Sequence, residues 1–343
     1  MGLEILLHIG RHKSGTSSLQ AYLNSQDLLH RAQGVVYPLA GRSLERHGRL
    51  TRQIAHHPLA LSFLDKDQIT ARAYQQQVLS ELRAELPRDC RVIFSSESFG
   101  NLIQAEQIER LQAFLNELEP DHITVFAYVR EFLDFISSGF RQRVQNSTDL
   151  FALSEYAPLR NRHYSLSNWL EAWSRVGTLV CRRFSRDALI DGDVIADFCL
   201  HAGLDLHHHL PRSEQNPSIG GNLLFLKCAL NRLGRHHPSL YNLMGEQAAL
   251  QPAYRRPFPI SAADAEQIRA GSCWNSTLEQ LFGGFRMPTF AAMPPCPDLG
   301  TLEADLEQFG PLLSLVGTQP HELVALTRES CDWFTPFPNH QQP

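Results

Sequence analysis

The sequence lacks the features that mark secreted, zinc-binding and membrane-spanning proteins. Its seven cysteines are scattered and form no Cys-x-x-Cys pair, which argues against a disulfide framework and against a zinc site. No apolar run approaches the roughly 18 residues of a membrane span, and the first residues show neither a basic segment nor a long apolar one. We therefore expect no transmembrane segment, a reducing compartment and a cytoplasmic location.

The chain also lacks an excess of either charge. Its formal net charge is −5 over 343 residues, with 31 Lys and Arg against 36 Asp and Glu. This balance gives no general attraction to nucleic acid, so an anionic ligand must be bound by a local group of basic residues. With 43% apolar residues, the chain can bury one large core or two smaller ones.

Apolar runs that alternate with helical patterns predict the fold class. Strands are expected at residues 4–9, 91–95, 123–129 and 178–184. Because helical patterns separate them, we predict an α/β fold, a three-layer sandwich around a central parallel sheet. The expected helices include residues 67–86, 105–119, 194–202, 223–233, 262–282 and 301–309.

Two segments interrupt this alternation. Residues 43–57 are polar and rich in His and Arg, and we expect them to form a loop. From residue 284 onward, proline, glycine and small residues become frequent. We therefore predict an α/β domain over residues 1–283 and a C-terminal extension over residues 284–343, either packed on that domain or loosely attached to it.

A glycine- and hydroxyl-rich turn follows the first expected strand. It reads GRHKSGTSS over residues 10–18. The first unpaired N–H groups of a helix after such a turn favour an anion, and two glycines let the backbone approach a ligand closely. With Lys13 as a positive charge and several hydroxyl donors, the turn suits a phosphate. The alternative is an ordinary helix N-cap with a hydroxyl-rich first turn.

The segment IGRHKSGTSSLQ resembles the 5′-phosphosulfate-binding loop of sulfotransferases that use 3′-phosphoadenosine 5′-phosphosulfate (PAPS). It differs from the nucleotide loop GxxxxGK[ST], because Lys13 precedes Gly15. In the PAPS-dependent family, an Arg at a strand end and a Ser eight residues later hold the 3′-phosphate. The segment YVREFLDFISSGF places Arg130 and Ser138 at this spacing. The resemblance, which is to bacterial-type members, extends from about Leu3 to Phe282.

The resemblance implies a P-loop-like fold, PAPS as sulfuryl donor, 3′,5′-ADP as product and no metal. The acceptor would be a hydroxyl of a carbohydrate, a glycolipid or another small molecule. Lys13 would stabilise the leaving group of an in-line displacement, and Glu97, at the end of a strand, would act as general base. His12 and His8 are alternative bases, although we expect His8 to be a core residue. The implied cofactor-binding residues are Arg11, His12, Lys13, Ser14, Gly15, Thr16, Ser17, Arg130 and Ser138.

Two other functions remain open. A P-loop-type kinase or nucleotide hydrolase would need magnesium and an acidic residue at a strand end, whereas Arg130 ends the clearest strand. A non-catalytic nucleotide-binding module would bind the nucleotide without transfer. Ser18 stands where cytosolic family members carry the aromatic residue that stacks on adenine. Sequence patterns do not identify the residue that stacks on adenine or the acceptor. They also leave open the role of the extension and the oligomeric state, for which a homodimer is one option.

Overall fold

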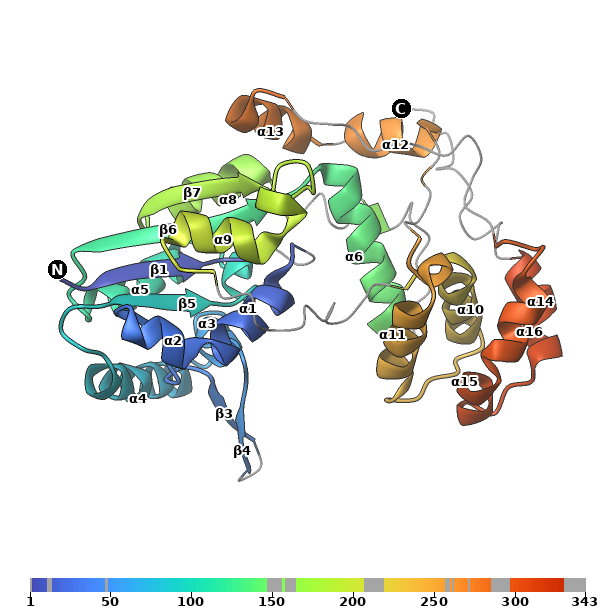
Figure 1. Cartoon of the computed structure of the whole chain (residues 1–343), viewed down its shortest axis with the longest axis horizontal. Helices are drawn as coiled ribbons and strands as arrows, with labels where there is room; N and C mark the ends of the chain where they lie inside the picture. Colours follow the sequence, from blue (N-terminus) through green and yellow to red (C-terminus); the bar gives the residue numbers. More distant parts are fainter. Residues whose placement is uncertain are drawn as a thin grey trace. The chain divides into compact units, whose positions relative to one another are not determined.

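The chain forms two compact units, each made of two segments. Unit 1 contains Met1–Arg130 and Leu166–Ser213, and unit 2 contains Glu131–Ser165 and Glu214–Pro343. Figure 1 shows the elements of both. The computed structural model describes residues 2–10, 14–46, 49–146, 156–157, 165–206, 219–256, 260, 262–270, 272–284 and 297–329.

Unit 1 is built on a five-stranded parallel sheet with the order β2-β5-β1-β6-β7. The central strand β1 pairs with β5 and β6, so that Glu4 lies opposite Arg91 and His122. The four strands predicted from the sequence are all present. The fifth, β2, has two residues and is too short to give a sequence pattern. The strands are β1 (Glu4–His8), β2 (Val35–Val36), β5 (Arg91–Ser95), β6 (His122–Val129) and β7 (Thr178–Arg183).

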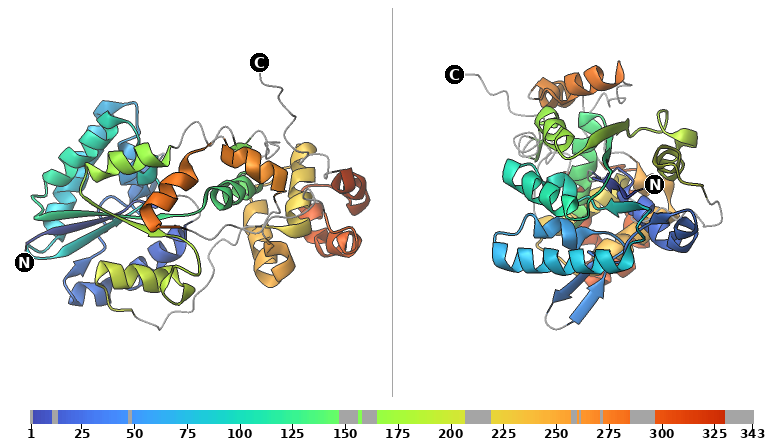
Figure 2. Two further views of the ribbon diagram at one scale, coloured as in Figure 1. Left: turned by 90° about the horizontal axis from the view of Figure 1, so that it is seen from above. Right: turned by 90° about the vertical axis from the view of Figure 1, so that its left-hand side faces the viewer.

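Helices cover both faces of this sheet (Figure 2). Helices α1, α2 and α9 lie on one face, and α4, α5 and α8 lie on the other. The predicted α/β class, with three layers around a parallel sheet, is confirmed. The helices of unit 1 are α1 (Thr16–Ser25), α2 (Asp27–Ala32), α3 (His57–Ser62), α4 (Gln68–Glu85), η1 (Phe99–Asn101), α5 (Ala105–Asn116), α8 (Leu166–Ser174), η2 (Ile190–Gly192) and α9 (Val194–Ala202).

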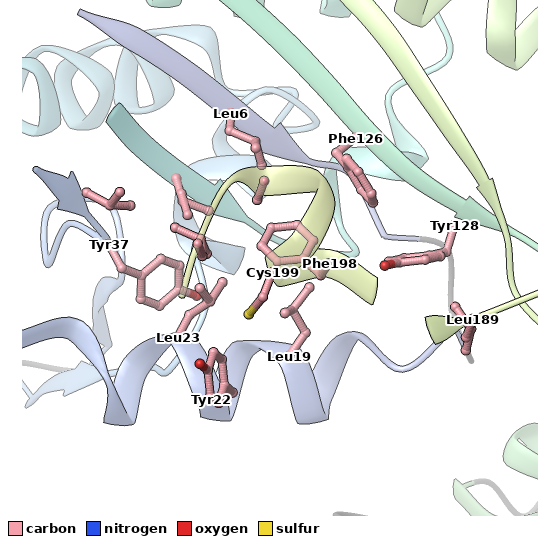
Figure 3. Close-up of a cluster of buried hydrophobic side chains, with 14 residues drawn as sticks. Leu6, Leu19, Tyr22, Leu23, Tyr37, Phe126, Tyr128, Leu189, Phe198 and Cys199 are labelled. Carbon is pink, nitrogen blue, oxygen red and sulfur yellow. The ribbon is translucent and has the colours of Figure 1, made fainter. Parts of the chain in front are cut away.

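A buried apolar cluster fixes α1 and α9 to the sheet (Figure 3). Leu6 and Phe126 point from the strands toward Leu19 of α1 and Phe198 of α9, and all four are 5% exposed or less. The rings of Phe126 and Phe198 meet edge to face, with centroids 5.2 Å apart. Burial of each such side chain contributes about 1.5–3 kcal/mol, so the start of α1 is held by packing behind it.

Helix α4 shows how local signals set helix ends. The Asp67 carboxylate accepts hydrogen bonds from the N–H groups of Ile69 and Thr70, at 3.1 and 3.3 Å, and so caps the first turn. The helix ends before Leu86, whose extended backbone leads into Pro87. The predicted helix over residues 67–86 is confirmed.

Two sequence predictions were wrong. Part of the expected loop at 43–57 is an antiparallel hairpin, β3 (Ser43–Arg46) with β4 (Arg49–Arg52), which forms a separate sheet. Backbone pairing creates it, and its polar sequence lacks the apolar alternation that identifies a strand. The helix expected over 262–282 is two helices, α12 (Ala262–Ala270) and α13 (Trp274–Phe282), because the chain turns before Trp274.

Unit 2 is helical wherever the structure describes regular elements in it. Helix α10 is buried and contacts α6, α14 and α16. The Asn222 amide donates to Asp305 at 2.6 Å, and the Tyr254 hydroxyl donates to the other oxygen of Asp305 at 2.7 Å. This hydrogen-bonded group attaches α14 to α10, whereas the domain boundary at residue 284 stays a prediction. The helices are α6 (Phe132–Asn146), α10 (Gly221–Arg232), α11 (Leu240–Leu250), η3 (Pro252–Arg255), α12, α13, α14 (Leu302–Gln308), α15 (Gly310–Leu315) and α16 (Pro320–Glu329).

In the part of the chain that the structure describes, none of the helices is both long enough and apolar enough to cross a membrane.

Candidate functional site

The carboxyl ends of the parallel strands bring the predicted residues of unit 1 to one edge of the sheet. Strands β2 and β5, which come after β1 in the chain, lie on one side of β1, and the later strands β6 and β7 lie on its other side. The order of the strands thus reverses direction at β1. Ligands of open α/β sheets bind at such a reversal, outside the carboxyl ends of the strands. Four residues follow four of these strands: Gly10 after β1, Glu97 after β5, Arg130 after β6 and Phe184 after β7.

The predicted strand is β1, and the helix expected after it is α1, which begins at Thr16. Gly15 immediately precedes α1 and has φ 72° and ψ 9°, a left-handed backbone that favours glycine. A Cβ atom at Gly15 would lie 2.9 Å from Val194 Cγ1 and 3.1 Å from Phe184 Cε2, so the turn is packed tightly against its neighbours. Gly15 occupies the N-cap position of α1 and has no side chain that could cap the helix. The first N–H groups of a helix favour an anion.

The turn also contacts the predicted base. The Thr16 hydroxyl donates a hydrogen bond to Glu97 Oε2 at 2.8 Å, across 81 residues of sequence. Two further glycines allow this approach, because a Cβ at Gly100 would lie 2.6 Å from the Gly10 carbonyl oxygen. The segments after β1 and β5 therefore touch through their backbones. Glu97 is half-buried beside the start of α1.

The serines next to Glu97 contact histidines. Ser95 Oγ lies 2.8 Å from His8 Nδ1. His8 is fully buried, as expected for a core residue, and its Nε2 has no hydrogen-bond partner within the described part of the chain. Burial lowers the pKa of His8 to about 3, and the nearby charge of Glu97 only partly opposes this effect. A pKa this low makes His8 a weak base that holds a proton poorly at neutral pH, which does not suit a general base.

A second histidine contact was not foreseen from the sequence. His57 Nδ1 lies 2.7 Å from Ser96 Oγ and 3.4 Å from Ser98 Oγ. His57 is the first residue of α3, within the segment that we expected to be a loop. No spacing rule connects a histidine to a serine 39 residues away. The packing of α3 at the end of β5 brings His57 to Ser96 and Ser98, the residues on either side of Glu97.

Arg130 lies close to the glycine turn through a shared neighbour. Its guanidinium carbon is 5.4 Å from the centroid of the Phe184 ring, a cation–π contact. The same ring is next to Gly15, and the Phe184 N–H donates to the Val129 carbonyl at 2.6 Å. The sequence analysis included Phe184 only as the last residue of a strand. The Phe184 ring is therefore a shared neighbour of Gly15 and Arg130.

The remaining predicted residues are placed less completely. Ser14 and Thr16 are buried, and Ser17 is half-buried in the first turn of α1. Ser138 is buried on α6 and belongs to unit 2, so its pairing with Arg130 stays a prediction. The predicted residues that lie outside the described residues are Arg11, His12 and Lys13.

The described residues contain no group of three or more His, Cys, Asp and Glu side chains that could hold a metal ion. Comparison of the chain with protein-family models and with curated proteins finds no significant match.

Proposed function

We propose that the chain is a PAPS-dependent sulfotransferase that moves a sulfuryl group to a hydroxyl of a carbohydrate, a glycolipid or another small acceptor. PAPS carries a phosphosulfate at its 5′ end and a phosphate at its 3′ position, and it therefore needs two separate anion-binding groups. The observation that carries the proposal is that the Gly15 turn and Arg130 border one aromatic ring, Phe184. A helix start after a glycine N-cap and a cation at one sheet edge suit such a ligand.

Each residue has a definite role in the proposed reaction. The Glu97 carboxylate, held by Thr16, accepts the proton of the acceptor hydroxyl. The acceptor oxygen forms a bond to sulfur while the bond from sulfur to the 5′-phosphate oxygen breaks, and the electron pair stays on the phosphate. Lys13 stabilises the negative charge on that leaving group, and Arg130 binds the 3′-phosphate. As in phosphoryl transfer, positioning and positive charge supply most of the catalysis.

The contact between Thr16 and Glu97 favours a second candidate. In P-loop kinases and hydrolases, a hydroxyl of the loop and a strand-end carboxylate together hold a magnesium ion. The Thr16 hydroxyl and Glu97 Oε2, 2.8 Å apart, form a pair of that kind. The two functions differ in donor and in metal dependence: sulfuryl transfer from PAPS should persist in EDTA, whereas phosphoryl transfer from ATP should require magnesium.

Binding of the nucleotide product tests the site directly. We expect 3′,5′-ADP to bind more tightly than 5′-AMP, which lacks the 3′-phosphate. Arg130→Met should weaken 3′,5′-ADP binding about 10- to 100-fold, the effect of one lost charged hydrogen bond, and leave 5′-AMP binding nearly unchanged. Arg183→Met is the matched control, because Arg183 ends the neighbouring strand β7 and pairs with Asp187 at 3.6 Å.

Transfer assays then separate the functions. The chain is incubated with ³⁵S-labelled PAPS or γ-³²P-labelled ATP, a panel of hydroxyl acceptors, and either magnesium or EDTA. Label transferred from PAPS in EDTA supports the proposal. Transfer only from ATP with magnesium supports the kinase and overturns the proposal, and so does a failure to bind 3′,5′-ADP at millimolar concentration. Binding of 3′,5′-ADP without transfer to any acceptor would indicate the non-catalytic module.

A further inference from the structure

Three histidines make hydrogen bonds to the end of β5 and to the turn that carries Glu97. His8 contacts the Ser95 hydroxyl, and His56 Nδ1 accepts the Ser95 N–H at 3.2 Å. His57 differs from both, because it is half-buried and contacts the turn after the strand. Of these three histidines, His57 is thus the one whose contacts fall on the residues that flank Glu97.

The hydrogen bonds define what His57 does in this turn. The Ser98 N–H donates to Ser96 Oγ at 3.0 Å. The same oxygen lies 2.7 Å from His57 Nδ1 and is hydrogen-bonded to it. Ser96 Oγ can both accept from the Ser98 N–H and share a hydrogen bond with the imidazole, because a hydroxyl has one hydrogen and two lone pairs. The imidazole therefore holds Ser96 and Ser98 in one arrangement, with Glu97 between them.

Backbone hydrogen bonds also hold the residues that follow Ser96 in the turn. The Phe99 N–H donates to the Ser96 carbonyl at 3.3 Å, and the Gly100 N–H donates to the Glu97 carbonyl at 3.2 Å. The Gly100 carbonyl in turn accepts from the buried Trp169 Nε1 at 2.9 Å. The path of the backbone at Glu97 thus depends on a short hydrogen-bonded turn whose first residue is fixed by His57.

His57 is not needed to attach α3 to the sheet. The His56 N–H already donates to the Ser95 carbonyl at 2.9 Å, and the Ser95 N–H donates back to the His56 ring. This reciprocal pair joins α3 to the end of β5 without His57. A purely structural role for His57 would duplicate an attachment that exists.

We infer that His57 is a positioning residue for Glu97, setting the place of the carboxylate relative to the acceptor hydroxyl through its hydrogen bond to Ser96. The inference rests on the proposed function, in which Glu97 is the general base. A base must stand within hydrogen-bond reach of the proton that it removes, and misplacement by about 1 Å can cost as much as 100-fold in rate.

Variants of His57 test this role. His57→Ala should lower kcat for sulfuryl transfer about tenfold, the effect of one lost hydrogen bond, with the Kd of 3′,5′-ADP within twofold of the native value. His57→Asn should restore kcat to within about threefold, because its amide oxygen can accept from Ser96. Ser62→Ala is the matched control on α3: its hydroxyl donates to the Leu59 carbonyl and accepts from Gln75 of α4, so kcat should be unchanged.

A second measurement does not depend on activity. Amide hydrogen exchange of residues 96–101 should be faster in His57→Ala than in the native chain, and His57→Asn should return it toward the native rate. If the native chain transfers no sulfuryl group, the proposed function fails, while the exchange data still test whether His57 orders the turn. Native kcat together with native exchange in His57→Ala would overturn the inference. A loss of 3′,5′-ADP binding parallel to the loss of kcat would also overturn it, because it would show general damage to the site.

Discussion

Replacement of Gly15 by alanine tests the tight packing of the turn before α1. Gly15 has φ 72°, and a left-handed backbone costs an alanine about 1–2 kcal/mol. Its Cβ would also lie 2.9 Å from Val194 Cγ1 and 3.1 Å from Phe184 Cε2, so one of these side chains must move. Overpacking of this kind costs about 1–3 kcal/mol. The free energy of unfolding of unit 1 should therefore fall by about 2–5 kcal/mol.

Gly34 provides a control that separates the two terms. Its φ is 75°, nearly the same as that of Gly15, but a Cβ atom there would meet nothing within 4 Å. Gly34→Ala should thus cost only the backbone term, about 1–2 kcal/mol. The difference between the two variants measures the crowding against Val194 and Phe184.

Urea unfolding read by amide hydrogen exchange of β1 and β6 reports on unit 1 itself, because these two strands pair at its centre. Equal losses of stability in Gly15→Ala and Gly34→Ala would refute the packing described here. In that case the ring of Phe184 would not be a shared neighbour of Gly15 and Arg130.

Three further measurements test other parts of the molecule. Burial lowers the pKa of both His8 and His56 from 6.5 to about 3, so the unfolded chain binds more protons below pH 6.5. Each histidine should make the free energy of unfolding fall by about 1.4 kcal/mol per pH unit from pH 6.5 toward pH 3. In urea unfolding, the free energy of unfolding of His8→Gln should depend less steeply on pH than that of the native chain. An equally steep pH dependence would contradict this. Asp305→Ala removes a buried carboxylate that accepts hydrogen bonds from Asn222, Tyr254 and Thr301, and the loss of these three bonds should cost about 2–4 kcal/mol by urea unfolding. Glu307→Ala, exposed on the same helix, should change stability by under about 0.5 kcal/mol. Gly245→Ala, in α11 with open space around it, should raise the thermal midpoint, since alanine is favoured over glycine in a helix by about 0.5–1 kcal/mol.

Local signals were enough to predict most elements of unit 1. The apolar run before Gly10 and the hydroxyl-rich turn after it identify β1 and the start of α1, because both patterns lie within a few residues. The limits of β5 (Arg91–Ser95) and α9 (Val194–Ala202) agree with the sequence prediction residue for residue. Glu97 follows the apolar strand β5 directly in the sequence, and in the structure it accepts a hydrogen bond from Thr16.

Contacts between segments that are distant in the chain could not be predicted from sequence patterns. His57 belongs to a segment that resembles a loop, and only the packing of α3 brings it to Ser96. Phe184 completes a strand pattern, yet its importance comes from Gly15 and Arg130, which are remote in the chain. Such neighbours depend on strand order, and strand order is set by the whole sheet.

The division of the chain into interleaved units constrains how it can fold during synthesis. Unit 1 is interrupted after Arg130 and resumes at Leu166 with α8, β7 and α9. A chain of only the first 130 residues therefore has a sheet without the edge strand β7 and without two of its covering helices, α8 and α9. Helix α6 is synthesised next, but it packs on α10, which emerges some 75 residues later than the end of α6. Nascent α6 must therefore stay protected, by a chaperone or by transient contacts of its own, until translation has nearly reached residue 232.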